Sequence, residues 1–323
     1  MPNENLKCID AGSEYCPCYL AETNDCIVCS QLSGKSFCDC NWNGVCIYQE
    51  YFWCGNKKKN HREISEAKII QKKEMTEQVT ILKLKTTQAL ARKLKHPGSY
   101  IFIRDVHKPV FFDVPMSIMK ADENKGEIEI AVHVLGPKTK SLIACSNTVL
   151  IKGPYWNGIL GFKDLKNMTE KKALLIARGI SLAPSLLTVQ YLLKNKNNVT
   201  FIMDSGKINH IFIDDYIKDL DIEKVVLNLR DQGERKIMTE ILKNGNYDLV
   251  YSGGSDRLHG MIANEIKNLG MQTKHIITNN SEMCCGEGIC GACSYQSRNG
   301  KVIKMCKTQL GAKDVLEGRK ADG

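Results

Sequence analysis

The chain has 323 residues, enough for two or three domains, and its 43% apolar and 25% charged residues exclude a disordered or fibrous protein. No apolar run approaches the roughly 18–20 residues of a membrane span. The N-terminus lacks the apolar stretch of a secretory signal. We therefore expect a cytosolic protein, without membrane association, whose cysteines are reduced.

The net charge of +9 would suit an acidic partner protein or a nucleic acid. The lysines are dispersed along the chain, however, and no nucleic-acid-binding motif accompanies them. This dispersion favours a solvated, lysine-rich surface, and we expect no nucleic-acid partner.

Fifteen cysteines are concentrated at the two ends of the chain, with nine before residue 55, five after residue 283 and Cys145 alone between them. Disulfides would not be confined to the ends of a protein whose middle is large enough to build its own core. The distribution favours two terminal metal sites on either side of a cysteine-poor body.

The first segment, residues 1–56, contains few aliphatic residues and would not fold without a staple. Its two C-x-C pairs and one C-x2-C pair place many thiolates within reach of one another. Thiolates permit either zinc or an iron–sulfur cluster, and disulfides are the third alternative. With Cys54 as a spare, eight cysteines could hold two tetrahedral sites: Cys8, Cys16, Cys18, Cys26, Cys29, Cys38, Cys40 and Cys46.

Residues 57–76 are strongly charged, have helical propensity and are predicted to be a linker. From Val79 the sequence V-T-I-L-K-L-K alternates like a strand, and a short helix is predicted over 87–94. Further strands are predicted at 100–104, 109–119, 127–134 and 148–151, with Gly and Pro turns between them. This many short strands predicts a small antiparallel β-barrel over residues 77–165.

Strands and helices alternate over residues 166–280, which predicts an α/β domain with a parallel sheet. The predicted strands are 173–178, 199–204, 225–229 and 249–252, and the predicted helices are 183–194, 234–243 and 256–268. The seven histidines of the chain are scattered without ligand spacing, so each is expected to be an ordinary surface or core residue.

Residues 281–310 carry the most specific motif of the chain, and residues 311–323 form a tail. Four cysteines stand as C-x4-C-x2-C-x12-C, and three glycines between the first three would let the loop curl around a cluster. The first three intervals are those of plant-type [2Fe–2S] ligation. The alternative, a structural zinc site, would favour two C-x2-C knuckles, and only one is present. Cys284 is the spare, and the predicted ligands are Cys285, Cys290, Cys293 and Cys306.

A barrel, an α/β domain and a C-terminal cysteine loop follow one another in a specific order. In this order the chain, from Gln78 to Lys307, resembles the electron-transfer subunit of dihydroorotate dehydrogenase, a branch of the ferredoxin–NADP reductase superfamily. The matching segments are P-G-S-Y-I-F-I-R (97–104), P-M-S-I (115–118), G-P-K-T-K-S-L (136–142), K-G-P-Y-W-N-G (152–158), G-I-S-L-A-P (179–184), S-G-G-S-D (252–256) and the cysteine loop.

The resemblance implies a flavin on the barrel. In that family the P-x-S segment lies against the isoalloxazine ring, so Pro115 would lie there and the Ser117 hydroxyl would bond the flavin N5. The G-x-x-T segment, here Gly136 and Thr139, would contact the flavin pyrophosphate. The alternative is that Ser117 is a strand hydroxyl facing solvent and that the glycines only form turns.

The resemblance also implies a nicotinamide nucleotide on the α/β domain. The turn from Gly179 to Pro184 would pack against the dinucleotide, with phosphate near a helix N-terminus. Gly253 and Gly254 would line the nicotinamide side of the crevice, at the carboxyl end of a strand. The alternative for Gly179 is a tight strand-to-helix turn without a ligand.

Three departures from the family bear on these roles. Val114 replaces an arginine that pairs with flavin phosphate, for which Arg104, Lys138 or Lys140 could compensate. Arg178 stands where the nucleotide turn has its first glycine; it could meet a phosphate, such as the extra phosphate of NADPH, or it could block the site. The later strand leads into S-G-G instead of C-G-P.

Two functions are therefore considered. In the first, an enzyme component passes electrons from NAD(P)H through FAD and the [2Fe–2S] cluster to a redox partner, such as a catalytic dehydrogenase subunit or an acidic electron carrier. This function favours an iron–sulfur cluster over zinc as the metal centre of the N-terminal segment. In the second, the chain is a redox-sensing or docking protein that keeps the reductase fold and has lost nucleotide turnover.

Overall fold

The computed structural model describes residues 6–297 and 300–319, and the chain divides into two compact units. The larger unit contains Ile64–Asn280 and, of the described residues, 311–319. The smaller unit joins residues 6–63 to Ser281–Leu310. The cysteine-rich segment and the cysteine loop, which the sequence separates by more than two hundred residues, therefore fold together.

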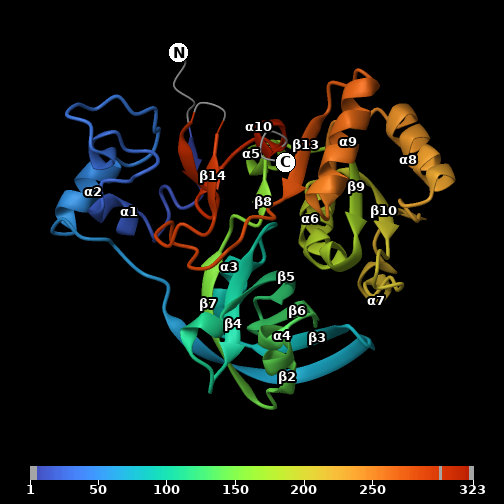
Figure 1. Ribbon diagram of the computed structural model, residues 1–323, viewed down its shortest axis with the longest axis horizontal. Helices are drawn as coiled ribbons and strands as arrows, with labels where there is room; N and C mark the ends of the chain where they lie inside the picture. The colour runs from blue at the N-terminus through green and yellow to red at the C-terminus, as the bar shows by residue number, and fades with distance from the viewer. Residues whose placement is uncertain (1–5, 298–299, 320–323) are drawn as a thin grey trace. The chain divides into compact units, whose positions relative to one another are not determined.

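Six antiparallel strands of the larger unit close into a barrel in the order β2-β3-β6-β5-β4-β7, which confirms the predicted barrel (Figure 1). Its interior is filled by buried aliphatic side chains such as Leu82, Ile101 and Ile130. The strands are β2 (Ile64–Thr76), β3 (Val79–Lys85), β4 (Tyr100–Asp105), β5 (Val114–Asp122), β6 (Glu127–His133) and β7 (Thr148–Tyr155). Two helices accompany them, α3 (Gln88–Leu94) and α4 (Pro137–Ala144).

The prediction of a linker over residues 57–76 is wrong from Ile64 onward, because β2 is a strand of the barrel. This strand pairs with β3 on one side and with β7 on the other, where Ile64 lies opposite Lys152. Ala67 is its one buried residue, and most of its lysines and glutamates face solvent. A strand this exposed lacks the alternation of apolar and polar residues that would have identified it.

The α/β domain has a six-stranded sheet in the order β11-β10-β9-β12-β13-β8. The first five strands are parallel and β8 runs antiparallel to β13, so the predicted parallel sheet is confirmed with a mixed edge. The strands are β8 (Ile159–Leu160), β9 (Lys172–Arg178), β10 (Asn198–Asp204), β11 (Glu223–Val226), β12 (Leu249–Gly253) and β13 (Lys274–Thr278). The helices are α5 (Phe162–Lys166), α6 (Leu182–Lys194), α7 (Asp214–Ile217), α8 (Gln232–Asn244), α9 (Asp256–Asn268) and α10 (Ala312–Arg319).

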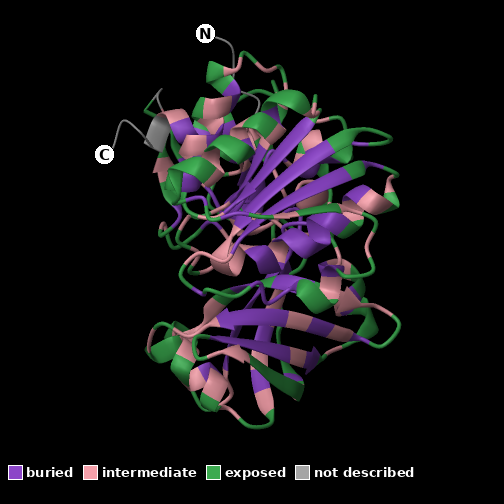
Figure 2. Ribbon diagram, turned by 90° about the vertical axis from the view of Figure 1, so that its right-hand side faces the viewer, coloured by how far each residue is buried: buried purple, intermediate pink, exposed green. Residues whose placement is uncertain are grey.

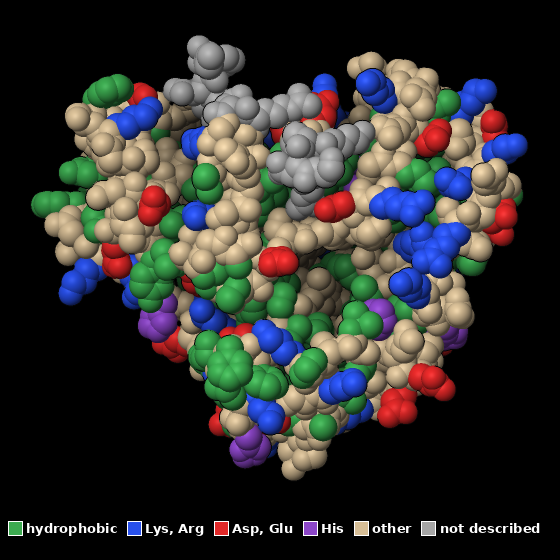
Figure 3. Space-filling model, viewed as in Figure 1, with side chains coloured by type: hydrophobic (Ala, Val, Ile, Leu, Met, Phe, Trp, Pro, Cys, Tyr) green, Lys and Arg blue, Asp and Glu red, His purple; other side chains and the backbone are tan. Residues whose placement is uncertain are grey.

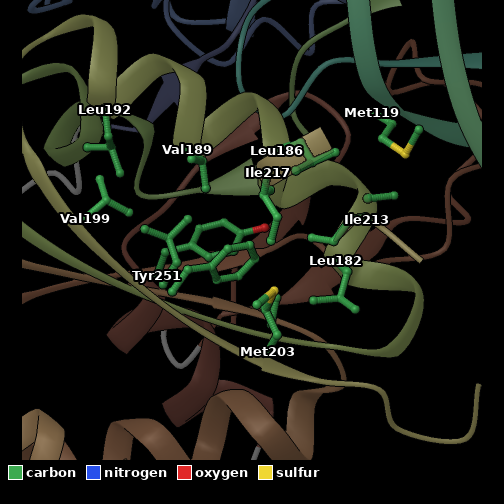
Figure 4. Packing of buried hydrophobic residues seen from close by; sticks show 14 of the residues in the cluster. Met119, Leu182, Leu186, Val189, Leu192, Val199, Met203, Ile213, Ile217 and Tyr251 are labelled. Carbon is green, nitrogen blue, oxygen red and sulfur yellow. The ribbon is translucent and has the colours of Figure 1, made fainter. Parts of the chain in front are cut away.

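Buried strands between partly exposed helices form the core of this domain (Figure 2). Helix α6 lies between the sheet and the barrel, because Leu182 and Leu186 belong to the same buried cluster as Met119 of β5 (Figure 4). Tyr251 of β12 is also fully buried in this cluster. The barrel and the α/β domain thus share a continuous apolar core.

The smaller unit is built from short elements and long turns, as expected for a segment with few aliphatic residues. Strand β1 pairs antiparallel with β16, with Cys8 opposite Thr308, and β14 pairs with β15. The elements are β1 (Lys7–Cys8), α1 (Tyr19–Glu22), α2 (Ile47–Trp53), β14 (Ser294–Gln296), β15 (Val302–Lys304) and β16 (Thr308–Gln309).

Among the described residues, the helices are all too short or too polar to cross a membrane. Lysine and arginine side chains are spread over several parts of the face that Figure 3 shows, with acidic side chains between them. This spread agrees with the dispersion of lysines along the sequence.

Candidate cofactor and cluster sites

The C-terminal cysteine loop curls as its sequence predicts. Gly286, Gly288 and Gly291 all have positive φ, at 71°, 80° and 79°. A side chain would be strained in this left-handed region, so glycine is required for the turns. The turns direct backbone N–H groups at the sulfurs: the N–H of Glu287 donates to Cys285 Sγ over 3.3 Å. The backbone N–H of Cys306 donates to Cys293 Sγ over 3.4 Å.

The four predicted ligands of this loop are brought together. Hydrogen bonds link the thiols of Cys285 and Cys290, of Cys293 and Cys306, and of Cys285 and Cys306. The bond from the Cys306 thiol holds the pKa of Cys285 and of Cys293 below the ordinary thiol value, although burial acts in the opposite direction. The four sulfurs thus form one connected row, Cys290–Cys285–Cys306–Cys293, and thiolates are favoured at two of them. Cys284, the predicted spare, is exposed.

A buried ionic network joins this loop to the N-terminal segment within the smaller unit. Lys307, which is fully buried, binds the carboxylates of Asp10 and of Glu287, the latter over 3.0 Å. Arg62 binds the same two carboxylates, over 2.8 Å to Asp10 and 3.3 Å to Glu287. The Arg62 guanidinium also lies over the ring of Tyr15, 4.1 Å from its centroid.

The two carboxylates balance the two cations of this network. Burial would lower the pKa of Lys307, but Asp10 and Glu287 raise it above its ordinary value. Burial would likewise raise the pKa of Asp10, but Lys307 and Arg62 lower it. Lys307 and Asp10 are therefore both charged around neutral pH, and the residue next to Cys306 is fixed to the N-terminal segment. Nothing in the local sequence indicated this network.

The N-terminal cysteines fall into two groups. Four of them line one cavity of the smaller unit: Cys8, Cys16, Cys18 and Cys26. In the second group, Cys29 is buried, and after burial itself the nearby Cys40 and Cys46 thiols contribute to the raised pKa of Cys29. Cys38 is exposed and Cys54, the predicted spare, is half-buried.

All fifteen cysteines are free thiols. Within residues 6–297 and 300–319, no three His, Cys, Asp or Glu side chains converge on a point that one metal ion could occupy.

The predicted flavin residues lie on the barrel and leave room for a ligand. Pro115 and Ser117 of β5 are both exposed, on the opposite side of the strand from Met116, which is buried. Gly136 precedes α4, and a Cβ added to it would meet no atom within 4 Å. The Thr139 hydroxyl accepts hydrogen bonds from the backbone N–H groups of Leu135 and Gly136, which fixes the start of the helix.

The cations considered as replacements for an arginine at position 114 are only partly available. Arg104 is buried and forms an ion pair with Asp113 at 2.6 Å, so its charge is already balanced within the barrel. Lys138 donates to the backbone carbonyl of Asp113 over 3.2 Å and is itself exposed. Lys140 is also exposed, at the same end of α4.

The predicted nucleotide turn lies at the carboxyl end of β9, at the start of α6. Gly179 has φ 61°, and an added Cβ would meet its first neighbours only at 3.9 Å, so space remains beside it. Pro184 lies in the first turn of α6, where proline is tolerated. Arg178 forms an ion pair with Asp204 of β10, from Nε to Oδ2 over 3.2 Å. Asp204 thus holds Arg178 across the ends of the two strands.

The glycine pair after β12 is closely packed. A Cβ on Gly253 would lie 3.1 Å from the Tyr251 ring, and one on Gly254 would lie 2.6 Å from Leu258. Gly254 also has φ 158°. A side chain at either position would therefore make Tyr251 or Leu258 shift, whether or not a nucleotide binds there.

Two histidines that the sequence analysis treated as ordinary belong to a polar network at this strand end. The Ser252 hydroxyl lies 2.8 Å from Nδ1 of His259 and 2.9 Å from Nε2 of His275. His259 Nε2 in turn lies 3.1 Å from the Thr278 hydroxyl. Burial, followed by the neighbouring His259, lowers the pKa of His275 to about 3, so this imidazole is neutral. The side chains come from β12, α9 and β13, and their wide separation in sequence hid the network.

The chain is similar in sequence to several known proteins. No protein-family model matches the chain. The electron transfer subunit of dihydroorotate dehydrogenase B (NAD(+)) from Clostridium perfringens is 25% identical over 198 residues, 61% of this chain and 77% of that protein. The gamma subunit of sulfhydrogenase 1 from Pyrococcus furiosus is 24% identical over 248 residues, 68% of this chain and 80% of that protein.

Among solved structures, the NADH-dependent reduced ferredoxin–NADP oxidoreductase is similar in fold, with a TM-score of 0.65 at 17% identity. The match covers 79% of this chain and 91% of the solved chain. The resemblance found in the sequence is thereby confirmed: the chain is a distant homologue of the dihydroorotate dehydrogenase B electron transfer subunits and has the two-domain fold of the ferredoxin–NADP reductases.

Proposed function

We propose that this chain transfers electrons between NAD(P)H and a partner protein, through FAD on the barrel and a [2Fe–2S] cluster in the C-terminal loop. The observation that carries the proposal is the arrangement of Cys285, Cys290, Cys293 and Cys306 as four neighbouring thiols on a loop of left-handed glycines. A [2Fe–2S] cluster needs two thiolates on each of two irons. The loop belongs to a chain with the reductase fold, and in such a chain the cluster would accept electrons one at a time.

The residues of the loop hold the cluster and set its environment. Four thiolates bind the irons, and the N–H groups of Glu287 and Cys306 donate to two of the sulfurs. Hydrogen bonds of this kind stabilise the reduced state and so adjust the reduction potential. Cys290 is exposed, which leaves one edge of the loop open to a redox partner.

The barrel residues fit a flavin. FAD, when bound, accepts a hydride and releases its two electrons one at a time. Ser117 and Pro115 present an exposed face to the ring, and the Ser117 hydroxyl would bond its N5. Gly136 would admit the pyrophosphate beside α4, where the exposed Lys138 and Lys140 supply positive charge in place of an arginine at position 114.

The α/β domain would orient the nicotinamide nucleotide. Gly179 leaves space for the dinucleotide at the carboxyl end of β9, and Pro184 helps to fix the helix that begins there. Gly253 and Gly254 would keep the end of β12 flat beside the nicotinamide. Arg178, held by Asp204, would offer a guanidinium to a nucleotide phosphate, which favours a donor with an additional phosphate.

The partner is proposed to be a protein subunit. The relatives are named as subunits of a dehydrogenase and of a sulfhydrogenase, so a catalytic dehydrogenase subunit or an acidic electron carrier is the expected partner. The net charge of +9 would favour an acidic docking surface on that partner. We propose no nucleic-acid or membrane partner.

A second candidate function is a redox-responsive docking protein without nucleotide turnover. Val114 and Arg178, which replace an arginine and a glycine of the family, favour it. Retention of flavin together with its reduction by NADH or NADPH would exclude it.

The variant Cys290→Ser tests the cluster assignment. We expect iron content to fall by about two atoms per chain and the paramagnetic signal of a reduced [2Fe–2S] centre to disappear, while flavin absorbance stays. The matched control is Cys284→Ser, an exposed cysteine in the same loop, which should change neither. An unchanged signal in Cys290→Ser would refute the ligand assignment.

A further inference from the structure

We propose that Cys8, Cys16, Cys18 and Cys26 bind a second iron–sulfur cluster, directly beside the C-terminal cluster loop. The redox role of this cluster rests on the proposed function. The four-cysteine site itself does not, because it is defined by residues of the smaller unit alone. The sequence identified nine N-terminal cysteines without indicating which of them share a site. In the structure, four of these cysteines line one cavity.

The cavity brings together cysteines from separate parts of the N-terminal segment. Cys8 ends β1, Cys16 and Cys18 form the C-x-C pair before α1, and Cys26 begins the C-x2-C pair. The thiols are electrostatic neighbours, Cys8 with Cys18 and Cys26 with both Cys16 and Cys18, and Cys26 also accepts a hydrogen bond from the backbone N–H of Cys29, which does not line the cavity. Apolar side chains complete the lining: Ala11, Pro17, Leu20, Ala21, Ile27, Val28 and Ile47.

Four thiols in an apolar cavity are suited to a metal centre. Cys16 is buried and Cys8, Cys18 and Cys26 are half-buried, so all four side chains are largely turned away from solvent. Bound iron would displace their protons and link four distant points of a segment that has few aliphatic residues.

An iron–sulfur cluster fits this cavity better than zinc. Zinc requires four sulfurs at about 2.3 Å from one point, and so roughly 3.8 Å from one another. Within the described part of the chain no three such side chains converge on one point. The thiolates of a polynuclear cluster bind different irons, so they surround a cavity without meeting at its centre. All four cysteines are free, so the site is not closed by disulfides.

The cavity adjoins the C-terminal cluster loop within the same unit. Cys8 is paired across the β1–β16 ladder with Thr308, two residues after the ligand Cys306. Paired strands lie about 5 Å apart and rise about 3.3 Å per residue, so Cys8 and Cys306 are neighbours on that scale. Leu20, which lines the cavity, also packs against Gly288 of the loop, since a Cβ on that glycine would lie 3.1 Å from it.

Side-chain charges fix this arrangement. Asp10 lines the cavity and binds Lys307, which follows Cys306 in the chain. The two centres would therefore keep a constant separation, and one electron could pass between them, oxidising one cluster as it reduces the other. The N-terminal segment would thus extend the path by which electrons enter or leave the [2Fe–2S] cluster.

Metal analysis of the full-length protein, purified without oxygen, tests the inference first. A [2Fe–2S] cluster alone would give about two irons and two sulfides per chain. We expect about four or six of each, according to whether the second cluster is [2Fe–2S] or [4Fe–4S], with no stoichiometric zinc. About two irons, with or without zinc, would overturn the inference and leave the proposed function intact.

Variants then locate the additional iron. Cys18→Ser should lose the iron in excess of two while keeping the paramagnetic signal of the C-terminal [2Fe–2S] centre. Cys54→Ser, a half-buried cysteine outside the cavity, is the matched control and should retain all iron. Equal iron in the two variants would overturn the assignment to this cavity.

The variant Cys290→Ser provides an independent measurement if Cys18→Ser does not fold. Its residual iron and sulfide should equal the excess over one [2Fe–2S] cluster in the unaltered chain. No residual iron would contradict the second cluster. If the unaltered chain shows no paramagnetic signal of the C-terminal centre and Cys290→Ser still contains iron, the proposed function is overturned. The second cluster would then still be supported.

Discussion

The buried ionic network of the smaller unit gives the sharpest test of how the two ends of the chain are held together. Lys307→Met keeps the length of the side chain and removes its charge, which leaves Asp10 and Glu287 with Arg62 as their only cation among these four residues. Removal of one partner from a buried ion pair costs about 3–5 kcal/mol. Because Arg62 still binds both carboxylates, we expect the lower end, about 3 kcal/mol, or roughly a 100-fold change in the opening equilibrium.

Hydrogen exchange of the backbone amides measures this locally. The ladder between β1 and β16, extended by the bond from the Ile9 N–H to the Lys307 carbonyl, lies beside the network. Peptides that cover residues 6–12 and 302–310 should exchange on the order of 100-fold faster in Lys307→Met. A global unfolding curve would be less informative, because a chain of several domains is not two-state.

Two further variants control for other effects of the substitution. Lys301→Met removes an exposed charge from the same unit and should leave exchange unchanged. Lys307→Met combined with Asp10→Asn restores a net charge of zero in the network and should exchange more slowly than Lys307→Met alone. Exchange in Lys307→Met within about threefold of the Lys301→Met value, or roughly 0.7 kcal/mol, would refute the account of the network.

Two more predictions follow from the charges and hydrogen bonds of the two units. Folding lowers the pKa of Asp10, so this carboxylate stabilises the folded chain at pH values above its unfolded pKa of about 3.9. The stabilisation is lost as the pH falls through the folded pKa. The difference in hydrogen exchange between the unaltered chain and Asp10→Asn should therefore shrink below about pH 4. A difference that stays constant to pH 2 would contradict this. Ser252→Ala should destabilise the larger unit by about 1–3 kcal/mol, since it leaves nitrogens of His259 and His275 without the hydroxyl between them. Hydrogen exchange of peptides that cover residues 249–260 and 274–279 measures it, and the exposed Ser146→Ala is the control; equal exchange in the two variants would show that the hydroxyl is dispensable.

Local patterns were sufficient to predict most of the larger unit. The alternation of V-T-I-L-K-L-K predicted β3, and the apolar runs around Leu175 and Phe201 predicted β9 and β10, because these residues face a core on one or both sides. Strand β2 was missed because it exposes its lysines and glutamates and is defined by pairing with β7, far away in the sequence.

The same distinction applies to the sites. The spacing and glycines of the C-terminal cysteine loop predicted that the loop would curl, because the loop is local in sequence. The ion pair between Asp10 and Lys307 joins residues almost three hundred positions apart, and no local pattern encodes it. The position of Cys8 beside the C-terminal cysteine loop depends in the same way on the pairing of β1 with β16.

The central claim is that this chain carries electrons from a nicotinamide nucleotide through a flavin to an iron–sulfur cluster. The most direct test is the visible absorption spectrum of the protein purified without oxygen, recorded before and after addition of NADH and then of NADPH. We predict flavin and cluster bands that bleach with one or both nucleotides. Cluster bands without flavin, or bands that respond to neither nucleotide, would contradict the claim and favour the docking protein.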